Sequence, residues 1–293
     1  MANLKEIRTR ISSVKTTRQV TSAMKMVSAA KLKKAQDAIV QIRPYAQKLS
    51  ELLSSLGAVL DNNPDSVYTL QRTPEKVLIV LISSNRGLCG GFNSSVAKKA
   101  ILWAKSVYSR QLKEGRVEFM VIGKQGEKIM RSYHYQPAFG HNELFDHLNF
   151  DNASLIAQQL MDDFSGGKYD RIDLVYNRFI NAAQQEQVSE QFLPVLPAQQ
   201  ETKRATAVDY IYEPSLEEIV EKLIPRSLKI QFYKALLNSH AAEHGARMTA
   251  MHKATDNATE LINELTLTFN KARQAAITNA ILEVTNGAEA LNS

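Results

Sequence analysis

Two long stretches with few helix-breaking residues, one at each end of the chain, constrain its fold most. No glycine occurs between Leu4 and Leu56, and Pro44 is the only proline there. Residues 215–291 also have helical character, although Pro225 is expected to kink that helix or to end a first one. At roughly 1.5 Å per residue, the helices would be about 80 Å and more than about 100 Å long. Both lengths exceed the diameter of a compact domain. Their apolar stripes must therefore pack against each other or inside a partner.

Both stretches carry the alternating three-four spacing of apolar residues that is typical of a coiled-coil seam. The first seam comprises Ile7, Ile11, Val14, Leu32, Ala35, Ile39, Ile42, Ala46, Leu49, Leu53 and Leu56. The second comprises Met248, Met251, Thr255, Ala258, Ile262, Leu265, Phe269, Ala272 and Ala276.

Between Val14 and Leu32 the first seam loses its apolar residues. The seam positions there are occupied by Arg18, Thr21, Lys25 and Ser28. The apolar residues Val20, Met24 and Val27 fall outside the seam positions, on another side of the helix. We therefore predict a seam interrupted over about two turns, where something other than the partner helix can touch the surface.

Charge is distributed unequally between the two predicted helices. Up to Lys48 the first carries eleven basic residues against Glu6 and Asp37, a net charge of +9, whereas the whole chain carries +6. From Ser215 onward eight basic residues face nine acidic ones. The basic helix indicates either a solvated surface or an acidic protein partner, and both interpretations stay open.

The middle of the chain alternates between predicted strands and helices, which favours an α/β layer with a largely parallel, Rossmann-like sheet. We predict strands at residues 76–83, 117–122, 171–179 and 187–192, and helices at 94–112, 125–133 and 152–164, the last capped by Asp151 or Asn152. Proline-containing linkers are expected at 57–74 and 194–214. The predicted division is an N-terminal coiled-coil helix at 1–57, an inserted α/β domain at 75–195 and a C-terminal coiled-coil helix at 214–293.

Two motifs resemble parts of catalytic sites without completing one. His240, Glu243 and His244 match the H-x-x-E-H spacing of a zinc peptidase, but a third ligand is not identifiable, and two surface histidines are the better interpretation. The loop Arg86, Gly87, Leu88, Cys89, Gly90, Gly91 follows a strand, where phosphate-binding loops lie, yet it lacks both glycine-rich phosphate motifs. We interpret its glycines as permitting a tight turn.

The remaining residues give no catalytic constellation. Cys89 is the only cysteine, so no intrachain disulfide can form, and we expect a small buried side chain in a reducing compartment. The longest apolar run is too short to span a bilayer, and the charged N-terminus is unlike a signal peptide, which predicts a soluble, cytoplasmic chain. We predict a structural or transmitting part rather than an enzyme, without cofactor or metal.

Three stretches together resemble the gamma subunit of the rotary F-type ATP synthase. They are the opening IRTRISSVKTTRQVTSAMKMVSAAKLKKAQ, the loop SSNRGLCGGFN and the closing ARMTAMHKATDNATELINELTLTFNKARQAAIT with EVTNGAEAL. The resemblance implies that the end helices pair as an antiparallel coiled coil, the central stalk, inside a hexamer of alpha and beta subunits. It implies that the α/β domain lies near the epsilon subunit and the membrane c-ring, and that the chain transmits torque between proton flow and ATP synthesis.

The resemblance also implies which residues couple the stalk to its partners. The coupling region maps onto Met24 and Lys25 in the first helix and onto Arg273, Gln274 and Thr278 in the last, and an apolar tip onto Ile281, Leu282, Val284 and Leu291. Cysteines at Met24 and near Arg273 are then expected to crosslink within one chain. Where the family pattern has a glutamate, this chain has Ala280.

The resemblance implies a peripheral subunit on the cytoplasmic face of a bacterial plasma membrane. The alternative is a basic coiled-coil protein with an α/β head that binds nucleic acid or serves as a scaffold. It explains the +9 helix but neither the interrupted seam nor the C-terminal motif.

Overall fold

The computed structural model describes residues 4–60, 67–195 and 216–292. The chain divides into two compact units. The first contains the segments up to Ser28 and from Met248 onward, and the second is Ala29–Arg247. The helices α1 (Leu4–Leu60) and α6 (Leu216–Asn292) each contribute residues to both units. The predicted three-part division at residues 57, 75, 195 and 214 stays a prediction.

A five-stranded sheet forms the centre of the second unit, in the order β3-β2-β1-β4-β5. The strands are β1 (Val77–Ile82), β2 (Val117–Ile122), β3 (Phe139–Gly140), β4 (Arg171–Phe179) and β5 (Gln185–Leu193). All neighbours are parallel except β4 and β5, which form an antiparallel pair at one edge. All six residues of β1 are buried, as expected for an apolar run in the middle of a parallel sheet covered on both faces. The predicted, largely parallel α/β sheet is therefore confirmed.

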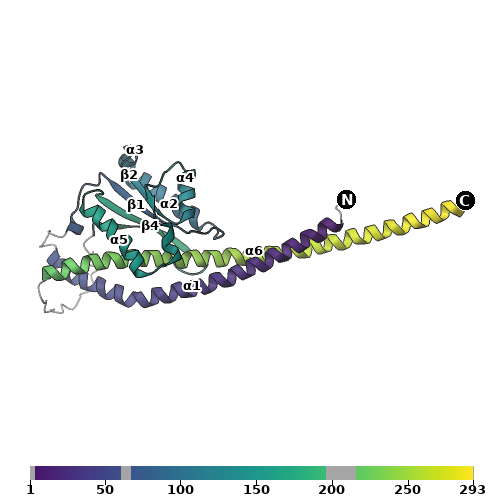
Figure 1. Cartoon of the computed structure of the whole chain (residues 1–293), viewed down its shortest axis with the longest axis horizontal. Helices are drawn as coiled ribbons and strands as arrows, with labels where there is room; N and C mark the ends of the chain where they lie inside the picture. Colours follow the sequence, from purple (N-terminus) through teal and green to yellow (C-terminus); the bar gives the residue numbers. More distant parts are fainter. Residues whose placement is uncertain (1–3, 61–66, 196–215, 293) are drawn as a thin grey trace. The chain divides into compact units, whose positions relative to one another are not determined.

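Alternate residues of β1 point into two different cores, because side chains of a strand alternate between the faces of its sheet. Val77, Ile79 and Leu81 pack with residues of α2 (Phe92–Val107) and α4 (Lys124–Ser132). Leu78, Val80 and Ile82 pack with α5 (Phe150–Ser165) and with Ile224, Leu228 and Phe232 of α6. Figure 1 shows α2 and α4 on one side of the sheet and α5 on the other. One stretch of α6 thus belongs to the core of the α/β unit.

Several predicted helix ends are wrong, because capping groups and packing determine where a helix ends more strongly than the local spacing of apolar residues does. α1 continues past Gly57 to Leu60. The predicted helix at 94–112 breaks at Tyr108 into α2 and the short α3 (Ser109–Lys113). The N-cap of α5 is Asn149, whose side-chain oxygen accepts from the Asn152 amide at 2.8 Å.

Of the two outcomes expected at Pro225, a kink or a helix end, the helix end does not occur, since α6 is helical from Leu216 to Asn292. The neighbouring residues Ile224 and Leu228 are 2% exposed and belong to the core. We attribute the continuity to this packing, which offsets the hydrogen bond that a proline removes. Two short 3₁₀ turns, at Val67–Thr69 and Asn142–Asp146, were not predicted. The predicted return linker at 194–214 lies outside the described residues beyond Val195.

A buried carboxylate on β4 ties α2 to the sheet. Asp173 is 0% exposed and accepts hydrogen bonds from Trp103 Nε1 at 2.7 Å and Tyr108 Oη at 2.5 Å. Arg171 Nε donates to its other oxygen at 3.1 Å. Burial and the nearby Asp173 raise the pKa of the Tyr108 hydroxyl. The carboxylate is therefore fully supplied with donors, as a buried charge must be.

Asp173→Ala should lower the free energy of unfolding by about 3–5 kcal/mol, because it leaves three buried or half-buried donors without their acceptor. The control is Glu186→Ala on β5, which removes only an exposed ion pair to Arg178 and should cost about 0–1 kcal/mol. Urea unfolding of the purified chain measures both. Similar losses for the two variants would show that Asp173 has no special role.

Candidate functional site

Two direct contacts set the pairing of α1 and α6 in the first unit. Thr255 Oγ1 donates to Thr21 Oγ1 at 2.8 Å, and Lys25 Nζ lies 3.3 Å from His252 Nδ1. The residue numbers rise on one helix as they fall on the other, so the helices are antiparallel. Ile7, Met251, Ala258 and Ile262 are buried in this pair. The antiparallel coiled coil is therefore confirmed in this unit.

The seam is polar between Val14 and Leu32, but the prediction that it is interrupted there is wrong. Thr21 and Ser28, at seam positions, are 9% and 2% exposed. Their hydroxyls are satisfied locally, Thr21 by the Arg18 carbonyl at 3.0 Å and Ser28 by the Met24 carbonyl at 2.7 Å. Small hydroxyl side chains can stay buried in a helix pair because they bond back to their own helix.

The apolar residues of this stretch lie on the outer side of α1. Val20 and Val27 are 52% and 57% exposed, and Met26 is exposed as well. Met24 is half-buried. These residues lie off the seam, as the sequence predicted, and contact of this outer side with another protein stays a prediction.

The structure places the predicted coupling residues at two separate levels of the helix pair. Lys25 lies opposite His252, whereas Arg273 is more than five turns further along α6, about 30 Å away. The expected crosslink between Met24 and Arg273 is therefore wrong. By the same register Leu4, the first residue of α1, falls opposite about residue 272. Residues 273–288, which include Gln274 and Thr278, are all exposed, and so is the predicted seam residue Ala276.

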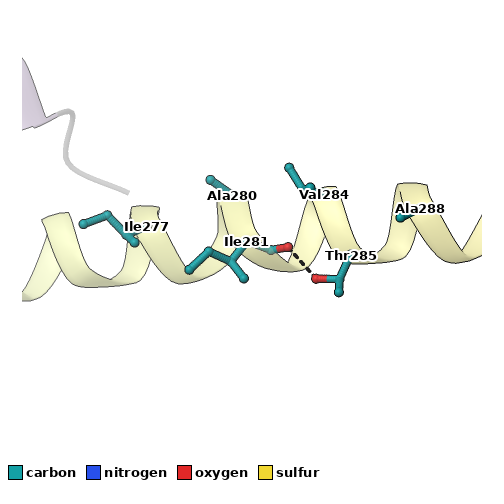
Figure 2. Close-up of a pocket in the computed structure, with 6 residues that line it drawn as sticks. All are labelled: Ile277, Ala280, Ile281, Val284, Thr285 and Ala288. Atoms are coloured by element: carbon teal, nitrogen blue, oxygen red, sulfur yellow. Dashed lines mark hydrogen bonds between the residues drawn. The ribbon is translucent and has the colours of Figure 1, made fainter.

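The exposed end of α6 carries an apolar strip. Ile277, Ala280, Ile281, Val284, Thr285 and Ala288 line a shallow groove along one face of the helix (Figure 2). The Thr285 hydroxyl donates to the Ile281 carbonyl, so its methyl group is free to extend the apolar surface. Ala280 contributes to the strip where a glutamate would interrupt it. Leu282 is exposed as well, and the side chain of Leu291 is outside the described ones.

The loop at 86–91, in the second unit, is held in a strained conformation. Leu88 has a φ of 62° and Gly90 a φ of 59°, a region that branched side chains rarely adopt. Ser84 Oγ donates to the Arg86 carbonyl at 2.7 Å, and Asn93 Nδ2 lies 3.3 Å from Cys89 Sγ. Cys89 is 2% exposed, which confirms the predicted small buried residue. The loop presents the Arg86 and Gly87 carbonyls to α6, which favours a structural turn over a phosphate site.

A row of polar residues on α6 meets this loop. Glu243, His244 and Arg247 are 5–6% exposed and His240 is half-buried, so the interpretation of His240 and His244 as surface histidines is wrong. Arg247 Nη2 lies 2.7 Å from Glu243 Oε1 and donates to the Arg86 carbonyl at 3.0 Å. Its Nη1 lies 3.2 Å from His244 Nδ1. Sequence reasoning missed Arg247, although its spacing from His240, Glu243 and His244 places all four on one helix face.

Burial controls the protonation of the two histidines. It lowers the pKa of His240 to about 4, assisted by Lys31 and Arg247, and that of His244 to about 3, assisted by His240 and Arg247. Their Nε2 atoms lie 3.1 Å apart, a distance that a neutral pair can bridge with one proton. Burial raises the pKa of the Glu243 carboxyl, and Arg247 opposes this. In the described part of the chain, no three His, Cys, Asp or Glu side chains are grouped to hold a metal ion.

The free energy of unfolding should fall as the pH falls from 6.5 towards 4. In this window the unfolded chain protonates its histidines at their ordinary pKa of 6.5, while His240 and His244 stay neutral in the folded chain. Each contributes a slope of up to about 1.4 kcal/mol per pH unit. Glu243 opposes part of this, since its raised pKa lets the folded chain bind a proton more readily. More than about one unit above pH 6.5, both histidines are neutral in both states, so their slope disappears.

His244→Gln should make that pH dependence shallower in urea unfolding measured at several pH values. The matched control is His252→Gln, because the side chain of His252 is 56% exposed. An unchanged slope in the first variant, or an equal change in both, would contradict the assignment to the buried pair.

Paired cysteines at Thr21 and Thr255 should form a disulfide within one chain under mild oxidation, because the replaced hydroxyl oxygens lie 2.8 Å apart. Cysteines at Met24 and Arg273 should not, since the register separates them by about 30 Å. Mobility on a non-reducing gel distinguishes the outcomes. A crosslink of the second pair alone would refute the register.

Comparison with known proteins agrees with this architecture. A family model described as ATP synthase matches residues 3–291. The ATP synthase gamma chain of Flavobacterium johnsoniae is 58% identical over 292 residues, covering 100% of both chains. That of Flavobacterium psychrophilum is 57% identical and covers 99% of both.

Solved structures share the fold. The central stalk/c-ring structure of the Tetrahymena thermophila mitochondrial ATP synthase contains a chain with a TM-score of 0.56 and 26% identity, covering 80% of this chain and 99% of that one. A chain of the rotor of the Euglena gracilis enzyme has a TM-score of 0.65 at 22% identity, with 94% and 98% covered. The alternative of a nucleic-acid-binding or scaffold protein receives no support from these relatives. With more than half identity to gamma chains over its whole length, this chain belongs to the ATP synthase gamma-chain family.

Proposed function

We propose that this chain is the non-catalytic rotor of a proton-translocating F-type ATP synthase. In this proposal it transmits torque between the membrane c-ring and the hexamer of alpha and beta subunits. The observation that carries the proposal is the antiparallel pair of α1 and α6, beyond which α6 continues as an exposed helix with an apolar strip. That helix end requires a partner, since exposed contiguous apolar surface marks an interaction site.

A rotor must present unlike surfaces to subunits that are otherwise alike. The basic residues of α1 and its exposed Val20, Met26 and Val27 differ in charge and shape from the nearly neutral α6. A surface that binds one conformation of a neighbouring subunit better than another shifts that subunit towards it by the difference in affinity. We propose this difference as the basis of coupling between rotation and the state of each catalytic site.

The coupling residues act at two levels in this proposal. Met24 and Lys25 belong to the lower level, beside the polar seam, while Arg273, Gln274 and Thr278 form an upper one on the exposed part of α6. The distance of about 30 Å between them means that different segments of the alpha and beta subunits would contact each level. Beyond the upper level, towards the C-terminal end of α6, an apolar sleeve formed by the partner subunits would receive Ile281, Leu282, Val284 and Leu291.

We propose that the α/β domain contacts the epsilon subunit and the c-ring on the cytoplasmic face of a bacterial plasma membrane. Within the described residues, no helix combines the length and apolar character needed to span a bilayer. In this proposal, membrane association is peripheral and passes through the c-ring.

A tagged copy of this chain, expressed in a strain of its source bacterium that lacks the native copy, tests the rotor proposal. It should co-purify with the alpha, beta and epsilon subunits and with ATP hydrolysis, and membrane vesicles should acidify when ATP is added. Recovery as a free chain that binds DNA, with no effect on proton pumping, would refute it.

Val284→Asp should reduce ATP-driven proton pumping, because an apolar partner surface against this strip would have to take up a carboxylate. Transfer of an unpaired charge into such a site costs several kcal/mol. Asn286→Asp is the matched control, since residue 286 is exposed on a different side of the same turn and already polar. The fluorescence quench of a pH-sensitive dye in vesicles, normalised to the amount of assembled complex, is the measurement. Equal effects would argue against an apolar partner on this face.

A further inference from the structure

The contact between α6 and the loop at 86–91 is polar and buried. Gln231 of α6 also donates to the Glu190 carboxylate and the Gln191 carbonyl of β5, but at 3.4 Å and from a half-buried side chain. Ile224, Leu228 and Phe232 pack through apolar surfaces, which are not directional. Arg247 instead bonds to backbone oxygens at defined positions, the Arg86 carbonyl at 3.0 Å and the Gly87 carbonyl at 3.4 Å from both Nε and Nη2. A planar guanidinium resists displacement because several bonds must break together.

The surroundings hold this guanidinium in place. Glu243 orients it from the preceding turn of α6 at 2.7 Å, and the pair is 6% exposed at each residue. On the loop side, Ser84 Oγ bonds to the Arg86 carbonyl, and Cys89 and Phe92 pack in one buried cluster with Ala242. At Gly245 an added Cβ would lie 3.2 Å from Ala182 Cα, so the connection between β4 and β5 also approaches the helix closely.

We infer that Arg247, oriented by Glu243, is the positioning residue that locks the α/β domain to α6 against rotation about the helix axis. The inference rests on the proposed rotor function. If torque enters through the α/β domain, it must pass to α6 through contacts that do not slip. The bonds of Arg247 to the loop carbonyls meet that requirement by adding directional contacts to the close packing of the apolar residues nearby.

The test uses the assembled complex in membrane vesicles. Because Arg247→Gln alone leaves Glu243 buried and unpaired, the principal variant is Glu243→Gln with Arg247→Gln, which removes both charges. ATP hydrolysis per assembled complex should remain, while the number of protons pumped per ATP should fall about fivefold or more. A chain with Arg247→Lys should also pump fewer protons per ATP than wild type, since a lysine cannot make the forked contact. Lys234→Gln, an exposed residue of the same helix, is the control and should behave as wild type.

A second variant separates locking from general stability. Ala242→Cys, added to the principal variant, places a thiol beside the native Cys89 in the same buried cluster. Oxidation by diamide should form a disulfide between helix and loop and restore pumping, and reduction should remove it again. A purely structural role would lower hydrolysis and pumping together with the amount of complex, and the disulfide would not restore their ratio.

The outcomes distinguish this inference from the rotor proposal. If wild-type chain and Lys234→Gln fail to support pumping, the rotor proposal is refuted. If both support it and the principal variant pumps equally well per ATP, the proposal stands and the role of Arg247 is refuted.

Discussion

The 77-residue helix α6 has to cover its apolar surface along its length, and most of this structure depends on how it does so. In the second unit the sheet and α5 cover it at Ile224, Leu228 and Phe232. In the first unit α1 covers it at Met251, Ala258 and Ile262. The cover ends where α1 begins, so α6 passes from a core, through a helix pair, to an exposed end. A helix in water gains little from its own propensity, and tertiary packing supplies most of its stability.

The polar part of the seam lowers the stability of the helix pair but defines its register. Thr21 and Ser28 bury less apolar surface than leucines would at the same positions. The hydroxyl pair Thr21–Thr255 and the contact of Lys25 with His252 can form in one alignment only, whereas apolar seams tolerate a slip of one heptad. Under the proposed function, exposed residues at two levels meet partners, so a defined register matters more than added stability.

The features that follow from patterns among residues close together in the sequence could be predicted. The long helices, the seam from Met251 to Ala272 and the strands around β1 all derive from the spacing of apolar residues, which the structure preserves. The prediction of an interrupted seam was wrong because an apolar pattern takes no account of side-chain hydrogen bonds. Thr21 and Ser28 stay buried because their hydroxyls bond to carbonyls of their own helix. Of the two outcomes expected at Pro225, the helix end does not occur, and core residues flank the proline. The contact of Arg247 with the loop involves carbonyl groups about 160 residues earlier in the chain, which no local pattern reveals. For the predicted coupling residues, the resemblance indicated which residues they are but not how far apart they lie along the helix pair.

The exposed end of α6 has a consequence for the life of the chain before assembly. An uncovered helix bearing Ile277, Ile281 and Val284 has little to keep it folded, and local opening of its backbone admits proteases. The same strip is apolar enough to attract other exposed chains. Under the proposed function, partner subunits cover this end, so a chain made in excess of its partners is open to proteolysis and an assembled chain is protected. The same segment would thereby limit the number of unassembled copies that a cell retains.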